Sequence, residues 1–163
     1  MGRATGVAAF MRNVWWAWPA AECLHFLALA ALAGTIGVFD LRLLGVAKAI
    51  QIRSLHRLVP AGAAAFAVSA ATGSLFLMTA PDQYLFNPAF KLKLGCMAIA
   101  GVNVLVFYGA YGRSLNGPGP PVEPGWPIKA IAGLSLASWA GVVIFGRLIT
   151  LFRPPAYLCI FCG

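Results

Sequence analysis

The sequence predicts an all-α protein: an integral membrane four-helix bundle with both termini on the same side of the membrane. Of the 163 residues, 61% are hydrophobic and 10% are charged, whereas soluble domains are roughly one-quarter charged. The mean hydropathy is +0.83. Four apolar runs are each long enough to cross a bilayer core, which takes about 20 helical residues. One domain, residues 1–163, accounts for the length.

The first span is expected at residues 19–40, after a tryptophan-rich segment, residues 14–18, that is typical of a lipid interface. Pro19 suits a first helical position, because the N–H of that position has no partner inside the helix. The apolar run is too long for a signal peptide and ends in Asp40-Leu41-Arg42, so we expect it to be retained. The connection at residues 41–57 mixes basic and apolar residues, as a helix lying at the headgroup level does.

The second span is expected at residues 58–80, a run without any charged residue. Pro60 falls in its first turn, where a missing N–H does no harm. Ser69, Thr72 and Ser74 are its best candidates for hydrogen bonds to another helix.

The third span is expected at residues 88–111, after a turn at residues 81–87, with Asn87 as its N-cap. Asn103 lies near the middle of this span and should find a hydrogen-bond partner. Residues 114–126 are rich in Pro and Gly, so we expect neither helix nor strand there.

The fourth span is expected at residues 127–151. Lys and Arg are divided equally between the two sides of the membrane, so their number does not decide the orientation. The densest short basic loop follows the first span, and we place that loop in the cytoplasm and both termini in the periplasm. Cys159 and Cys162 form a CxxC near the C-terminus. No His follows it and no second pair exists, so neither c-type haem attachment nor a four-thiolate metal site is expected.

Glu22 and His25 lie three residues apart in the first span and should share one face of that helix. Ionisable groups at membrane depth are costly unless they find partners, and they mark functional sites. Antiparallel spans should bring further side chains to the same end of the bundle: Met78, Lys93, Met97 and Arg147. Lys91 and Lys93 point about 200° apart, so we expect Lys93 to face inward and Lys91 to reach the interface.

This cluster has two interpretations. In the first, Glu22 pairs with Lys93 or Arg147, and the ion pair fixes how the helices pack. In the second, the cluster binds b-type haem. His25 would be the axial metal ligand, Lys93 and Arg147 would pair with the propionates, and Glu22 would orient groups or handle protons.

The second axial ligand of such a haem is open. The other histidine, His56, begins the second span about 22 Å from His25 along the bundle, so the two cannot ligate one iron. The candidates are Met78, Met97 and Lys93, a group from another subunit, or no ligand at all.

Copper is a third possibility, because Met, His and Cys are the soft ligands that suit Cu(I). Met78, Met97 and His25 are candidates, together with Cys23 and Cys96. The two cysteines are equally typical of residues that pack inside apolar helices.

The spans contain several short motifs: Glu22-Cys23-Leu24-His25, the glycines of the first span, Asp40-Leu41-Arg42-Leu43-Leu44-Gly45, Phe90-Lys91-Leu92-Lys93 with Asn103, and Gly146-Arg147-Leu148-Ile149. Together they resemble a family of uncharacterised bacterial four-helix membrane proteins. That family is similar to copper-resistance D-type membrane domains and to the four-helix bacterial protoporphyrinogen oxidase family. In the oxidases a His on helix 1 and a Lys on helix 3 are implicated with bound haem b, and the matching positions are His25 and Lys93. Glu22 stands where the oxidases tend to be basic, so the resemblance implies haem binding and not porphyrinogen oxidation.

The expected function is that of a non-catalytic subunit of the bacterial inner (cytoplasmic) membrane. It would bind b-type haem near His25 and pass electrons between a redox partner and the quinone pool. Expected partners are the lipid bilayer, other membrane or periplasmic redox subunits, and further copies of the chain. The net charge of +8 comes from residues at the ends of apolar runs, where headgroups lie, so nucleic acid is not an expected partner. The alternatives are a cofactor-free anchor or assembly subunit and a copper-handling membrane protein.

Overall fold

The computed structural model describes residues 6–46, 48, 50–116 and 124–152, and in this part of the chain all regular structure is helical. Among the described residues, four helices are long and apolar enough to cross a membrane. The protein is therefore a multi-pass, all-α membrane protein, and the predicted four-helix membrane fold is confirmed, while the side on which the termini lie stays a prediction. The four spans are α2 (Ala17–Leu43), α4 (Val59–Thr79), α6 (Pro88–Asn116) and α7 (Trp126–Leu148).

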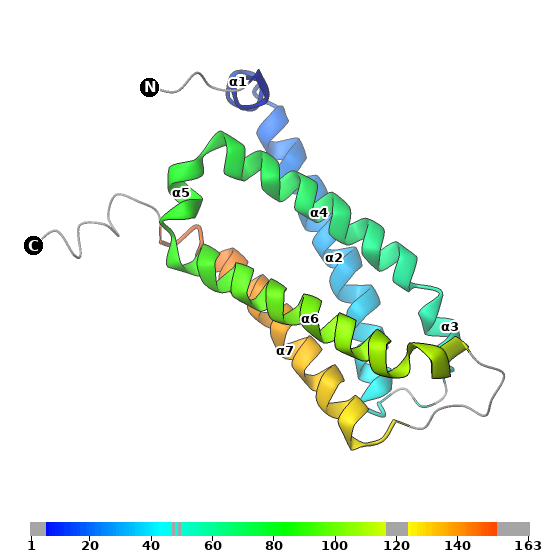
Figure 1. Cartoon of the computed structure of the whole chain (residues 1–163). Coiled ribbons are helices and arrows are strands. Elements are labelled where there is room, and N and C mark those ends of the chain that lie inside the picture. The colour runs from blue at the N-terminus through cyan, green and yellow to red at the C-terminus, as the bar shows by residue number, and fades with distance from the viewer. Residues whose placement is uncertain (1–5, 47, 49, 117–123, 153–163) are drawn as a thin grey trace, which may run out of the picture.

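Consecutive spans run in opposite directions, so the start of α2 and the end of α7 lie at the same end of the bundle (Figure 1). α2 packs along α4 and also against α7, and α6 packs along α7. Within the described residues, α4 and α6 make at most isolated contacts with each other. The bundle is therefore closed on the side of α2 and α7 and spread on the side where α4 and α6 face each other.

Three short helices flank the spans: α1 (Gly6–Asn13), α3 (Ile52–His56) and α5 (Pro81–Leu85). α1 packs against α4. α3 confirms part of the helix expected in the first connection. The turn expected at residues 81–87 is wrong for its first five residues, which form α5. Pro81 begins this helix and Asp82 lies in its first turn, both of which favour a helix N-terminus.

The predicted ends of the first, third and fourth spans need correction. The first span continues past residue 40 and ends at Leu43, because Gly45 adopts a φ of +92° and the Val46 N–H bonds to the Leu41 carbonyl in a Schellman turn. α6 continues through residues 114–116, where no helix was expected, since the glycine and proline residues that disfavour helix begin only at Gly117.

α7 ends at Leu148 and not at residue 151. The other part of the Pro- and Gly-rich loop, residues 117–123, lies outside the described residues. Cys159 and Cys162 of the CxxC lie outside them as well.

Two buried asparagines join the helices of the α6–α7 pair. Asn87, 1% exposed, accepts the Ala89 N–H at 3.0 Å, which confirms it as the N-cap of α6. Its Nδ2 atom also donates to the carbonyls of Ile149 at 3.1 Å and Phe152 at 2.8 Å, beyond the end of α7. Asn103 finds its partner in the Ile131 carbonyl, 3.1 Å from Nδ2. Each asparagine thus links one helix to the backbone of the other.

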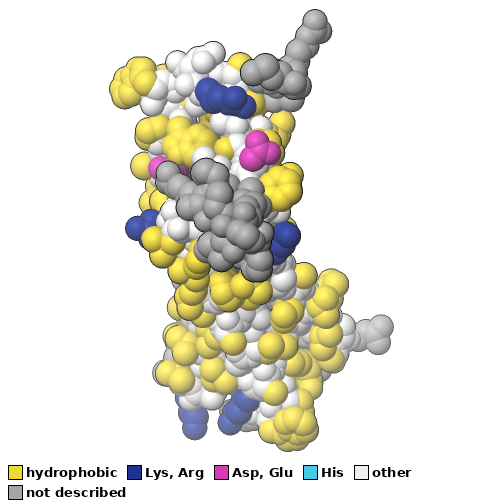
Figure 2. Space-filling model, turned by 90° about the vertical axis from the view of Figure 1, so that its left-hand side faces the viewer, with side chains coloured by type: hydrophobic (Ala, Val, Ile, Leu, Met, Phe, Trp, Pro, Cys, Tyr) yellow, Lys and Arg dark blue, Asp and Glu magenta, His cyan; other side chains and the backbone are white. Residues whose placement is uncertain are grey.

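The outer surface of the spans is apolar, with exposed side chains such as Leu27, Val102 and Leu105. On the face shown in Figure 2, Lys and Arg side chains lie on either side of a hydrophobic belt. A belt of this kind is typical of lipid contact, with the basic residues at headgroup level.

Candidate functional site

His25 lies on the face of α2 that packs against α4. Its Nδ1 atom is 2.8 Å from Oγ1 of Thr72. The ring packs edge-to-face on Phe76, with the ring centroids 5.7 Å apart. Next to Thr72, Gly73 lies so close that a Cβ there would be 3.6 Å from Cε1 of the imidazole. The imidazole therefore faces a neighbouring helix, as the sequence predicted, and it is half-buried.

The hydrogen bonds of Thr72 assign the tautomer of His25. The Thr72 hydroxyl donates to the Val68 carbonyl at 2.8 Å, as threonines within helices commonly do. With the hydroxyl proton directed to that carbonyl, the Thr72 oxygen accepts from the imidazole, and Nδ1 of His25 carries the hydrogen. The Nε2 atom then has a free lone pair, which is the form of imidazole that ligates metals.

Lys93 on α6 faces inward. Its side chain is half-buried, and its Nζ atom lies 3.5 Å from the position that a Cβ on Gly146 of α7 would occupy. It is close enough to His25 for the two side chains to interact electrostatically. Lys91, two residues earlier, is exposed. The expected division between the two lysines is confirmed.

Of the predicted methionines, Met97 lies one turn beyond Lys93, on the same face of α6, and lines the cavity described below. Met78 is 47% exposed near the end of α4. Met97 is therefore directed into the bundle and Met78 is not.

Glu22 and Arg147 are both exposed. The expectation that Glu22 shares the inward face of His25 is wrong. Three residues turn a helix through about 300°, which leaves the two side chains about 60° apart. That angle is enough to place Glu22 beyond the edge of the contact with α4. An ion pair of Glu22 with Lys93 or Arg147 thus does not form part of the bundle interior.

The soft donors proposed for copper do not converge. Cys23 is exposed, and Cys96 packs at the α6–α7 contact, where its Sγ atom lies 2.7 Å from the position of a Cβ on Gly141. Within the described residues, no group of three or more His, Cys, Asp or Glu side chains could hold a metal ion. The packing interpretation of Cys96 fits its position.

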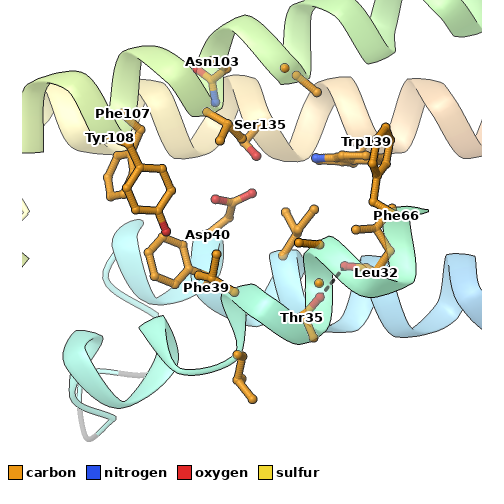
Figure 3. A pocket seen from close by; sticks show the side chains of 18 of the residues that line it. Leu32, Thr35, Phe39, Asp40, Phe66, Asn103, Phe107, Tyr108, Ser135 and Trp139 are labelled. Atoms are coloured by element: carbon orange, nitrogen blue, oxygen red, sulfur yellow. Dashed lines mark hydrogen bonds between the residues drawn. The ribbon is translucent and has the colours of Figure 1, made fainter. Parts of the chain in front are cut away.

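A cavity of about 300 Å³ lies between the four spans, toward the end of the bundle where α2 finishes. Most of its wall is apolar (Figure 3). Five aromatic side chains contribute to it: Phe39, Phe66, Phe107, Tyr108 and Trp139. Four further polar side chains also line it: Thr35, Asp40, Asn103 and Ser135.

Asp40 is the most unusual residue of this cavity. It is 5% exposed and accepts a hydrogen bond from Ser135, yet its Oδ2 atom has no hydrogen-bond partner among the described residues. In the same part of the chain, the Nε1 atom of Trp139 is also buried without a partner. Figure 3 shows both groups directed into the cavity, from α2 and from α7.

Sequence reasoning did not single out Ser135 or Trp139 as site residues, and it treated Asp40 only as the end of a span and as part of a resemblance. One feature of the sequence could have identified Asp40 as a site residue. Its carboxylate comes before Gly45, the glycine at which the helix ends. That pattern places the acid within the apolar segment, where it needs partners.

Comparison of the chain with protein-family models, with curated proteins and with solved structures found no match. The family resemblance noted in the sequence therefore stays a prediction, and the function must be argued from the residues themselves.

Proposed function

We propose that this chain is a membrane subunit that binds b-type haem through His25 and takes part in electron transfer between a redox partner and the quinone pool. The observation that carries the proposal is the hydrogen bond between Nδ1 of His25 and Thr72, 2.8 Å long. With Nδ1 donating to Thr72, Nε2 is a lone-pair donor on an imidazole held by a neighbouring helix. When bound, haem supplies an iron that accepts and releases single electrons.

The residues around His25 suit this group. Histidines that ligate metals commonly donate their other N–H to a fixed acceptor, and Thr72 is such an acceptor here. Lys93 provides a cation near His25 that can pair with a propionate. Phe76 packs against the imidazole and limits the access of water. Met97 is the preferred second ligand from this chain, because Met78 is directed outward.

The exposed charges have more peripheral roles in this proposal. Arg147 lies in the last turn of α7, where it can meet a propionate at the headgroup level. Glu22 is exposed and suits proton handling at that surface. We place the protein in the bacterial inner membrane with its termini in the periplasm, where periplasmic or membrane redox subunits, or further copies of this chain, would meet it.

The test is a reduced-minus-oxidised spectrum of the protein purified from cells with an ample haem supply. The wild type and His56→Ala are expected to show the bands of b-type haem, and His25→Ala is expected to lose them. His56 is the matched control because it is the other histidine of the chain and lies in α3. A wild-type protein without these bands, or a His25→Ala protein that keeps them, would overturn the proposal.

Metal analysis of the same samples separates the remaining alternatives. Copper bound in proportion to the protein would favour a copper-handling function. If the samples contain neither haem nor copper and a partner subunit co-purifies at a fixed ratio, the result would favour a cofactor-free anchor or assembly subunit.

A further inference from the structure

We propose that the cavity around Asp40 and Trp139 binds a lipid-soluble molecule whose aromatic head carries a hydroxyl group, as an alkyl phenol or a quinol does. The cavity shares Met97 with the proposed haem site, but its two groups without partners, Oδ2 of Asp40 and Nε1 of Trp139, have no part in that site. The inference therefore stands whether or not the chain binds haem.

The two buried groups without partners define the polar part of the ligand. Oδ2 of Asp40 is a hydrogen-bond acceptor, and Nε1 of Trp139 is a donor and nothing else. A buried polar group without a partner is unfavourable, so both atoms gain from a ligand that supplies the missing bonds. A hydroxyl group can donate to the carboxylate and accept from an indole N–H.

An ammonium group would fit less well. It could pair with the carboxylate of Asp40, but it carries donors alone and would leave the indole N–H of Trp139 without an acceptor. A hydroxyl group carries both a donor for the carboxylate and an acceptor for the indole N–H. The polar groups therefore favour a neutral hydroxyl over a cation.

The size and composition of the wall favour an aromatic head. A volume of about 300 Å³ is near the lower end of ligand pockets, which hold roughly 300–1,000 Å³. Phe39, Phe107 and Tyr108 line it close to Asp40, and aromatic side chains pack well against an aromatic ring, edge-on or offset. The cavity thus suits a single substituted ring.

The separation of α4 from α6 indicates that the ligand enters the cavity from the lipid bilayer. Both helices line the cavity, yet within the described residues they make at most isolated contacts with each other. Phe66 of α4 and Gly101 of α6 line the cavity and are both exposed. An alkyl tail can leave between these two helices and lie among the lipid chains.

Gly101 allows a steric test of this route. A Cβ at this position would meet nothing within 4 Å, so Gly101→Leu adds a side chain at the cavity wall without a clash in the backbone. Gly109 lies on the same helix, has equally open surroundings and does not line the cavity. Gly109→Leu is therefore the matched control.

The experiment measures binding of 4-decylphenol to the full chain in lipid nanodiscs, with the signal of protein-free nanodiscs subtracted. We expect saturable binding to the wild type and to Gly109→Leu. Binding should weaken at least about tenfold when the hydroxyl is methylated, as in 4-decylanisole, because the ether has no O–H to donate to the Asp40 carboxylate. Gly101→Leu should weaken it by a similar factor.

Trp139→Phe keeps an aromatic ring and removes the N–H, and Trp126→Phe, at a position 80% exposed on the same helix, is its control. We expect 4-decylphenol to bind more weakly to Trp139→Phe and with unchanged affinity to Trp126→Phe. The proposal is overturned by non-saturable binding to the wild type, by equal binding of phenol and anisole, or by equal binding to both leucine variants. Tighter binding of 4-decylbenzylammonium would also overturn it. A protein that binds the phenol but lacks haem would refute the haem proposal and leave this one standing.

Discussion

The hydroxyl of Thr72 on α4 lies 2.8 Å from Nδ1 of His25 on α2, and when it donates to the Val68 carbonyl it accepts the hydrogen of Nδ1. The two residues are 47 positions apart in the chain. One hydrogen bond between α2 and α4 therefore both holds the two helices together and orients the imidazole of His25.

Thr72→Val should weaken haem binding while leaving the fold intact. Valine has nearly the shape of threonine but cannot accept from Nδ1, and loss of such a second partner commonly lowers metal affinity by roughly 10- to 100-fold. Titration of haem into the purified protein measures the change. Ser74→Ala is the control, because that hydroxyl bonds within its own helix, to the Ala70 carbonyl, and its loss should leave the affinity unaltered.

Asn87→Asp separates capping from interhelical bonding. Aspartate caps a helix as well as asparagine does, so a capping role alone predicts no loss of stability. In the structure, however, Nδ2 of Asn87 donates to two carbonyls near the end of α7. A carboxylate would repel those oxygens, and we expect a loss of about 1–3 kcal/mol in the free energy of unfolding. Unfolding in a denaturing detergent measures it, and wild-type stability would argue against the α6–α7 link.

Gly141→Ala should destabilise the contact between α6 and α7. The added Cβ would lie 2.7 Å from Sγ of Cys96, so the thiol must rotate away. We expect a cost of about 1 kcal/mol, at the low end for overpacking, because the thiol can change its rotamer. Gly133→Ala on the same helix meets nothing within 4 Å and should cost nothing. Combining Gly141→Ala with Cys96→Ala should remove most of the clash, and additive losses in the double variant would contradict this contact.

Lys91 should react faster than Lys93 with a water-soluble amine reagent. Lys91 is exposed, whereas the Lys93 side chain is half-buried and packs against Gly146. Mass spectrometry after brief labelling of the protein in vesicles gives the modified fraction at each site. Equal rates would show that the Lys93 amine reaches water as freely as Lys91, contrary to the inward position in the structure.

The spans were predictable because each is a long apolar run with a start signal and a stop signal. Pro88 after Asn87 marked the start of α6, and Gly45 marked the end of α2 more accurately than Asp40 did. Helical angles showed that Lys91 and Lys93 cannot both face inward, and the choice of Lys93 as the inward residue agrees with the structure. The exposure of Glu22 was not predicted, because a 60° difference matters only when the edge of the helix contact is known.

The cavity could not be predicted from the sequence. It depends on how far α4 stands from α6, and no local pattern encodes that separation. Asp40 could be recognised from the sequence as an acidic residue inside an apolar segment. The lack of a hydrogen-bond partner for the N–H of Trp139 could not, because it depends on side-chain packing. Sequence patterns define each helix well and define the spaces between helices poorly.

The bond between His25 and iron can be tested directly. The chain has two histidines, so in His56→Gln every histidine nitrogen belongs to His25. The measurement is electron–nuclear double resonance of ferric His56→Gln protein grown with ¹⁵N-histidine. We expect a strong coupling between iron and one ¹⁵N nucleus. Bound haem whose spectrum shows no ¹⁵N coupling, or protein that holds no haem at all, would contradict the account.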